Sequence, residues 1–177
     1  MIDPLYSLSG LAVGFLVGMT GVGGGSLMTP LLILLFGIHP ATAVGTDLLY
    51  AAATKTGGSL VHGLAHSIDW TVVRRLAAGS IPATVITLGV LSHFNINGEA
   101  ASGLITLVLS AALFTTALVL VFGGPLVRLY RARVSALDPQ RTARSTIVVG
   151  AVLGVLVSIS SVGAGAIGVV QLVMLYP

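Results

Sequence analysis

The chain has 177 residues, of which 55% are hydrophobic and only 7% are charged, with a formal net charge of +3 at pH 7. A soluble domain carries about 25% charged residues, so this composition excludes a water-soluble fold. Residues 103–122 are apolar without alternation, which excludes a transmembrane β-barrel. The sequence therefore predicts an all-α polytopic membrane protein, and without cysteine it has no disulfide or thiolate site.

The first apolar segment is too long for one straight span. Apolar segments lie at residues 5–36, 41–61, 71–92, 100–123 and 146–176. A straight helix over residues 5–36 would reach about 48 Å at about 1.5 Å per residue, whereas the hydrocarbon core is about 30 Å thick. The glycine-rich run at 21–25 permits non-helical backbone. We therefore expect two short arms that meet at a break, with Pro30 about one turn inside the second arm, where its missing N–H is tolerated.

The second segment carries two ionisable side chains, Asp47 and Lys55. Each such residue costs about 2.5–3.5 kcal/mol at the centre of an inserted helix, so both are candidates for a transport pathway. Asp47 either titrates in proton coupling or caps a broken helix. Lys55 either lines the pathway or extends its ammonium group to the cytoplasmic boundary. Their eight-residue spacing puts both on nearly the same helix face, which favours a water-filled path lined by both.

Polar residues follow this helix at His62, His66 and Asp69. His62 and His66 are four residues apart and can share a ligand, but no third strong ligand is placed, so a solvated loop is favoured over a metal site. Trp70 is expected to anchor the membrane interface. No Ser-His-Asp or paired-carboxylate arrangement occurs, so we expect neither an enzyme nor a cofactor.

Arginine positions predict the topology. Five of the eight basic residues lie in the polar connection 124–145: Arg128, Arg131, Arg133, Arg141 and Arg144. The positive-inside rule places this connection in the cytoplasm, which explains the net charge without a nucleic-acid partner. Arg74 and Arg75 fall on the same side, and the turn at 93–99 is then outside. The N-terminus is inside if the first segment crosses fully and outside if it is a re-entrant hairpin; we favour the second, with inverted repeats.

The broken segment occurs twice. Residues 10–37 and 150–177 align without a gap and share nine identities in 28 positions, including Gly23 with Gly163 and Gly25 with Gly165. Paired segments interrupted by glycine at corresponding positions indicate the central binding site of a secondary transporter. The expected organisation is a first repeat at 1–123, a cytoplasmic arginine-rich loop at 124–145 and the start of a second repeat at 146–177. We expect either further chain or association with another copy to complete that repeat.

The two breaks are the candidate anion site. Backbone N–H groups at the start of a helix bind anions without a basic side chain, and irregular backbone inside a membrane must be buried or line a cavity. The expected substrate-binding residues are Gly23, Gly24, Gly25, Ser26, Thr29, Thr46, Ser161, Gly163 and Gly165. Gln171 either faces the site or joins helices. The glycine run lacks the lysine of a P-loop.

Other glycines have the spacing of helix packing. Gly10, Gly14 and Gly18 form a ridge that lets helices approach, and we interpret Gly150 and Gly154 in the same way. Pro30 is expected to be structural.

The string from Gly18 to Gly63, followed by Ile68-Asp69-Trp70, resembles the N-terminal half of the sulfite exporter TauE/SafE family of membrane permeases. The resemblance extends into the second Gly-x-Gly at 163–165. It implies two related repeats that move sulfur-containing anions such as sulfite or sulfonates. The residues that match its motifs are Gly23, Gly24, Gly25, Pro30, Gly45, Thr46, Asp47 and Lys55.

The sequence thus predicts a permease that moves a small sulfur-containing anion across the bacterial inner membrane and holds it at the glycine breaks. The expected partners are this anion and the lipid bilayer, without nucleic acid, metal or cofactor. Two alternatives stay open: a non-transporting membrane scaffold subunit that recruits a partner through the arginine-rich loop, and a passive anion channel. The identity of the anion, the direction of transport and the coupling ion are not fixed by the sequence.

Overall fold

The fold is all-helical, as predicted. The structure, a computed structural model, describes residues 4–20, 23–66, 68–93, 99–134 and 138–176. Within these ranges it contains seven helices and no strand. The helices are α1 (Pro4–Thr20), α2 (Gly25–Leu34), α3 (Pro40–Leu64), α4 (Trp70–His93), α5 (Glu99–Val134), α6 (Pro139–Ser160) and α7 (Ala166–Leu175). The first apolar segment is indeed two arms, α1 and α2.

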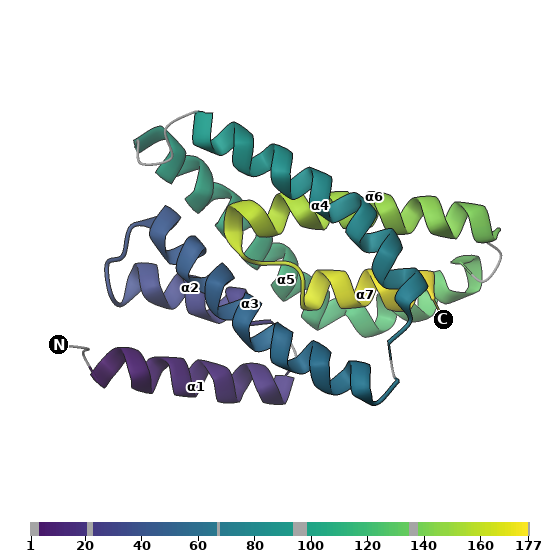
Figure 1. The fold of residues 1–177 in the computed structure, drawn as a ribbon, viewed down its shortest axis with the longest axis horizontal. Helices are drawn as coiled ribbons and strands as arrows, with labels where there is room; N and C mark the ends of the chain where they lie inside the picture. The colour runs from purple at the N-terminus through teal and green to yellow at the C-terminus, as the bar shows by residue number, and fades with distance from the viewer. Residues whose placement is uncertain (1–3, 21–22, 67, 94–98, 135–137, 177) are drawn as a thin grey trace.

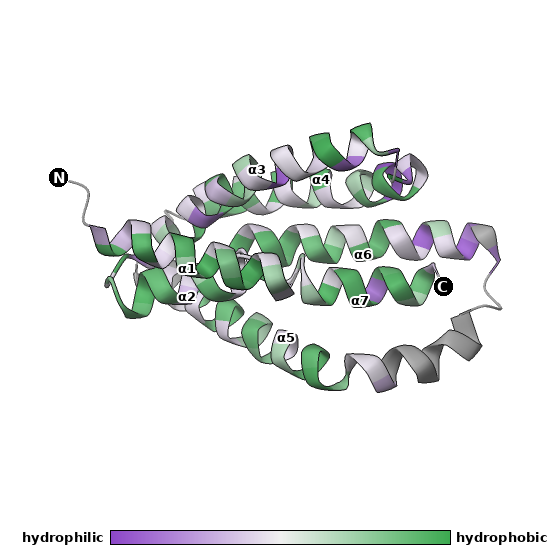
Figure 2. Ribbon diagram, turned by 90° about the horizontal axis from the view of Figure 1, so that it is seen from below, coloured by the Kyte–Doolittle hydropathy of each residue, from purple (hydrophilic) through white to green (hydrophobic). Residues whose placement is uncertain are grey.

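Three stretches are long and apolar enough to cross a membrane: Trp70–His93 in α4, Ser102–Pro125 in α5 and Gln140–Ser160 in α6. Helices α1, α2 and α7 are apolar but shorter. Exposed large apolar side chains such as Leu11, Phe15 and Leu107 occur along these helices. Figure 2 shows hydrophobic residues along much of α2, α6 and α7 and hydrophilic residues near the start of α6. Lipid is the solvent that suits such a surface.

Each glycine-broken segment folds back on itself as a helical hairpin (Figure 1). In the first hairpin, the ring of Tyr6 near the start of α1 stacks on Phe36 just after α2, with ring centroids 4.3 Å apart. In the second, the hydroxyl of Thr146 in α6 lies 2.9 Å from the hydroxyl of Tyr176 just after α7. Neither segment continues as a straight helix through its break.

The two hairpins enter the molecule from opposite ends, and their tips meet near its middle (Figure 1). The open end of the first hairpin lies with the starts of α3 and α5, where Ser102 and His39 are hydrogen-bonded at 2.7 Å. The open end of the second lies with the start of α4, because Arg75 donates to the hydroxyl of Tyr176 at 3.2 Å. The glycine breaks are thereby brought together.

Helices α4 and α6 run in parallel and pack closely along small residues. A Cβ added at Gly79 would overlap the backbone of Ile147, and one added at Gly154 would come within 2.7 Å of the Ser80 carbonyl. Gly150 faces the backbone of Leu76 in the same way. The interpretation of Gly150 and Gly154 as packing glycines fits this crossing. By contrast, nothing lies within 4 Å of a Cβ added at Gly10 or Gly18, and at Gly14 the neighbour is the Tyr50 hydroxyl.

The polar stretch expected as a loop at 124–145 is mostly helical. Helix α5 continues to Val134, and α6 begins at Pro139, which takes the first helical position after Asp138. Arginine is a good helix former, so polarity alone did not mark a loop here. The side chains of Arg128, Arg131 and Arg133 lie outside the described part of the structure.

Candidate functional site

The site is built where the two glycine breaks touch. Gly23 has φ +95° and Gly163 has φ +111°, a backbone region that L-residues with a side chain rarely adopt. A Cβ added at Gly23 would lie 3.4 Å from the Cα of Gly165, and one added at Gly25 would overlap the carbonyl of Ser161. The two breaks, which lie far apart in the sequence, are therefore in direct backbone contact, which only glycine allows at Gly25.

Two helix N-termini open at this contact. In α2, Leu27 and Met28 donate to the Gly24 carbonyl, and in α7, Gly168 and Val169 donate to Gly163 and Gly165. The amides that precede them have no acceptor among the described residues: Gly25, Ser26, Ala166 and Ile167. Each helix start carries a partial positive charge. The arrangement can stabilise an anion at the tips without a basic side chain.

A small cavity of about 30 Å³ lies between the breaks. Its walls are residues 23–26 of the first break and 161–165 of the second, together with Val157 of α6 and Leu48, Ala51 and Lys55 of α3. A water molecule needs about 10–15 Å³ by this kind of measure. The cavity thus has room for about two waters, which is the scale of one small oxyanion.

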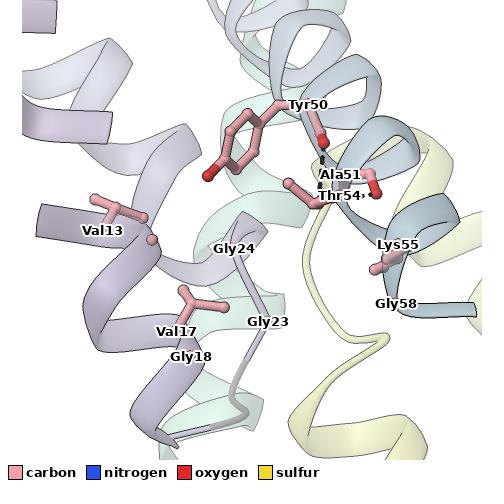
Figure 3. Close-up of a pocket in the computed structure, with 11 residues that line it drawn as sticks. Val13, Val17, Gly18, Gly23, Gly24, Tyr50, Ala51, Thr54, Lys55 and Gly58 are labelled. Atoms are coloured by element: carbon pink, nitrogen blue, oxygen red, sulfur yellow. Dashed lines mark hydrogen bonds between the residues drawn. The ribbon is translucent and has the colours of Figure 1, made fainter. Parts of the chain in front are cut away.

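A larger cleft of about 380 Å³ adjoins it between α1 and α3 (Figure 3). The two spaces share Gly23, Gly24, Ala51 and Lys55. The cleft is otherwise mostly apolar; the ring of Tyr50 points from α3 toward α1 in Figure 3. A volume in this range is typical of small-molecule sites. It supplies a space from which a ligand can reach the small cavity.

Asp47 lies behind the first break. Its side chain is fully buried, and Thr29 of α2 donates to its Oδ2 at 2.9 Å. The same oxygen lies 3.1 Å from a Cβ added at Gly25, and Oδ1 lies 3.7 Å from one added at Gly24. Oδ1 is buried and accepts no hydrogen bond from any described residue. The carboxyl group is thus held against the first turn of α2.

Asp47 and Lys55 do not line the same cavity, although a path lined by both was expected. Lys55 lines both cavities, whereas Asp47 lines neither. Helix α2 begins at Gly25, so the backbone of Gly24 and Gly25 lies against the carboxyl of Asp47 and also forms part of the cavity wall. Lys55 is exposed, and it is the cationic side chain of these walls.

Two of the hydroxyl groups predicted to bind the substrate donate hydrogen bonds within the protein instead. Ser26 lines the small cavity, but its hydroxyl donates to the Gly23 carbonyl at 2.9 Å. Thr29 is fully buried and donates to Asp47, so its proton is directed away from the cavity. Thr46 is exposed and lines neither cavity. Of the expected substrate-binding residues, those that line the small cavity are Gly23, Gly24, Gly25, Ser26, Ser161, Gly163 and Gly165.

Pro30 and Gln171 lie in α2 and α7, outside the walls of both cavities. Pro30 is the sixth residue of α2, in its second turn, so it cannot donate to the Ser26 carbonyl one turn earlier. The buried Oε1 of Gln171 has no hydrogen-bond partner among the described residues.

The polar residues beyond α3 have local structural roles. His66 Nδ1 lies 3.0 Å from the Leu64 carbonyl. Asp69 accepts from the backbone N–H groups of Thr71 at 2.8 Å and Val72 at 3.3 Å, which caps the start of α4. These hydrogen bonds, with a smaller contribution from the charge of Arg75, hold the pKa of Asp69 below its ordinary value. No cluster of three metal-ligating side chains occurs within the described ranges.

Tyr50 was missed in the sequence as a cavity residue. It lies three positions after Asp47 and five before Lys55, on the stretch of α3 that follows the break. An aromatic side chain with a hydroxyl between two ionisable residues could have indicated a cavity residue from the sequence alone. Its direction toward α1 depends on the hairpin, which the sequence pattern does not specify.

Comparison with known proteins shows that the sequence resembles membrane transporters. The family model described as "Sulfite exporter TauE/SafE" matches residues 6–177. The chain is 38% identical over 170 residues to the "Probable membrane transporter protein YjnA" of Bacillus subtilis, which covers 96% of the chain and 66% of that protein. It is 26% identical over 168 residues to a "Probable membrane transporter protein" of Haemophilus influenzae, covering 91% of the chain and 59% of the relative.

A shorter match is to the "Probable membrane transporter protein YunE" of Bacillus subtilis, 38% identical over 68 residues. The chain spans about two thirds or less of the length of these relatives. No solved structure matches it significantly.

Proposed function

We propose that this chain, which belongs to the sulfite exporter TauE/SafE family, holds a small sulfur-containing anion between its two hairpin tips as part of a membrane permease. The observation that carries the proposal is the contact of the two breaks around one small cavity. Each break leads into a helix start whose first amides have no acceptor among the described residues. The charge of the ligand is thereby matched mainly by the backbone.

Lys55 gives the site its side-chain cation. Its position on the wall shared by the cleft and the small cavity lets it attract an anion in the cleft and neutralise it at the tips. An oxyanion such as sulfite, or the head group of a sulfonate, has several acceptor oxygens for the amides of both breaks. The larger cleft is the route by which this ligand reaches the tips.

The protein is an integral membrane protein, and we place its arginine-rich end in the cytoplasm. Helices α4 and α6 start at the same end, which brings Arg74 and Arg75 together with Arg141 and Arg144. The positive-inside rule assigns that end to the cytoplasm of a bacterial inner membrane. The opposed hairpins support inverted repeats, with the start of α1 outside.

The test is flux of radiolabelled sulfite into vesicles that contain the purified protein, compared with empty vesicles. We expect uptake that saturates with concentration, because a carrier has a finite number of sites. Lys55→Gln removes the cation and should lower the apparent affinity at least several-fold, whereas Lys55→Arg keeps the charge and should retain most of the activity.

The outcomes separate the alternatives. No uptake above empty vesicles by the wild type would contradict the substrate class. Uptake that stays linear with concentration would favour a passive channel over a carrier. Unchanged affinity in Lys55→Gln, with the protein inserted normally, would contradict the site at the hairpin tips.

A further inference from the structure

We propose that Asp47 binds the coupling proton of this transporter, so that one proton is taken up with each bound anion. The proposal rests on the anion site at the hairpin tips. It assigns to Asp47 a role as a positioning residue that acts through the start of α2 and does not itself touch the anion.

The carboxyl group of Asp47 is buried with few hydrogen-bond partners. Asp47 is fully buried, Oδ2 accepts one hydrogen bond from Thr29, and Oδ1 has no partner in the part of the chain that the structure describes. A buried carboxylate that lacks a counter-charge or a full set of hydrogen bonds is costly, and neutralisation is the usual solution. Oδ1, the oxygen without a partner, is the one that can take a proton.

The described residues around Asp47 supply no compensating charge nearby. The elements packed against Asp47 contain no titratable side chain in α2, in the second break at 160–165, or in residues 102–125 of α5. On α3 itself the nearest ionisable groups are Tyr50 and Lys55, and no ion pair joins Lys55 to Asp47 within the described residues. Lys55 is about 12 Å along the helix axis and faces the cavities.

The start of α2 links the proton to the anion. The carboxyl of Asp47 lies against Gly24 and Gly25, and these two residues also form part of the wall of the small cavity. The positive end of α2 can stabilise a negative charge on Asp47 or on a ligand at the tip, and two negative charges this close oppose each other. Protonation of Asp47 therefore favours anion binding, and anion binding favours protonation by the same factor.

Proton movement is complete in this scheme. The carboxylate takes a proton from water on the side where the anion enters, becomes a neutral carboxyl group while the tips are occupied, and returns the proton on the side where the anion leaves. Because Asp47 is fully buried, both exchanges require the hairpin tips to separate. Transport of the anion and of the proton then depend on the same motion.

The experiment measures binding of methanesulfonate to the purified protein at several pH values, since the charge of this anion is constant over the usable range. Proton uptake on binding is followed with a pH indicator in weak buffer. For the wild type we expect affinity to fall by up to about tenfold per pH unit above the midpoint, and one proton to be taken up per anion. Proton uptake is measured on the wild-type protein, so this test does not require any variant to fold.

Asp47→Asn mimics the neutral carboxyl group and should bind the anion without pH dependence and without proton uptake. Asp47→Glu keeps a titratable group and should restore the uptake. Asp69→Asn is the matched control, because it makes the same change at an exposed carboxylate, and it should behave as the wild type.

Three results would overturn the proposal. Anion binding by the wild type without proton uptake would do so, and so would uptake that persists in Asp47→Asn. Binding that depends on sodium at constant pH would replace the proton by a sodium ion. If the wild type binds no oxyanion at any pH, the anion site itself fails, which is distinct from binding that is merely uncoupled.

Discussion

The hydroxyl groups of Thr146 and Tyr176 lie 2.9 Å apart and close the hairpin of α6 and α7. These residues stand 140 positions after Tyr6 and Phe36, whose stacked rings close the hairpin of α1 and α2. The offset is the same as that of the two glycine breaks. Corresponding positions thus close both hairpins, with an aromatic stack in one and a polar contact in the other.

The polar closure predicts the effect of Tyr176→Phe. The substitution removes the contacts of the hydroxyl with Thr146 and with Arg75, while Thr146 keeps its bond to the Thr142 carbonyl. A hydrogen bond contributes about 0.5–1.5 kcal/mol. We expect a modest loss of thermal stability and faster hydrogen exchange in α7. Tyr6→Phe is the control, because Tyr6 contributes its ring; equal effects of both substitutions would contradict the assignment.

The contact between breaks predicts a difference between two neighbouring glycines. In Gly25→Ala the new methyl group would overlap the Ser161 carbonyl, whereas in Gly24→Ala its nearest neighbour is Asp47 Oδ1 at 3.7 Å, an ordinary contact. Overpacking costs about 1–3 kcal/mol. We expect Gly25→Ala to lower the melting temperature in detergent and abolish sulfite flux, with Gly24→Ala folding normally. Equal stability of the two variants would show that the tips are not packed as described.

The crossing of α4 and α6 predicts a second pair. Gly79→Ala places a methyl group on the backbone of Ile147, while Gly89→Ala on the same helix meets nothing within 4 Å. Alanine is favoured over glycine in a helix by about 0.8–1 kcal/mol. We therefore expect Gly89→Ala to be neutral or stabilising and Gly79→Ala to be destabilising, as measured by thermal unfolding. A stabilised Gly79→Ala variant would place the crossing elsewhere.

Asp69 predicts a pH dependence at the start of α4. Because hydrogen bonds from Thr71 and Val72 lower its pKa in the folded protein, its stabilising effect is complete above the unfolded value of about 3.9 and is lost as the pH falls through the lower folded value. We expect Asp69→Ala to lower the melting temperature at neutral pH, with a gap to the wild type that closes below about pH 4.

Asp69→Asn provides the control for this titration. Asparagine is also a good N-cap residue but does not titrate. Its difference from Asp69→Ala should therefore persist in acid. A gap between wild type and Asp69→Ala that is independent of pH would mean that the carboxylate does not cap the helix.

Local features of the sequence determined the fold class and the positions of the two helix breaks. The low charge and long apolar runs are sufficient for an all-α membrane protein, because they reflect the solvent. The glycine runs at 21–25 and 161–165 identified the breaks, since backbone freedom is a property of the residue itself. The arginine-rich stretch predicted as a loop is helical up to Val134 and again from Pro139, because polarity does not distinguish a loop from a helix end.

Only the tertiary structure decided what each of these residues faces. Gly25 and Gly24 are equivalent in the sequence pattern, but only Gly25 meets the Ser161 carbonyl. Thr29 was expected at the anion and instead donates to Asp47. Of the two residues expected to line a shared path, Lys55 lines the small cavity and Asp47 does not. The reason is physical: a hydroxyl or a carboxylate is assigned its partner by the elements that pack against it, and these lie far away along the chain.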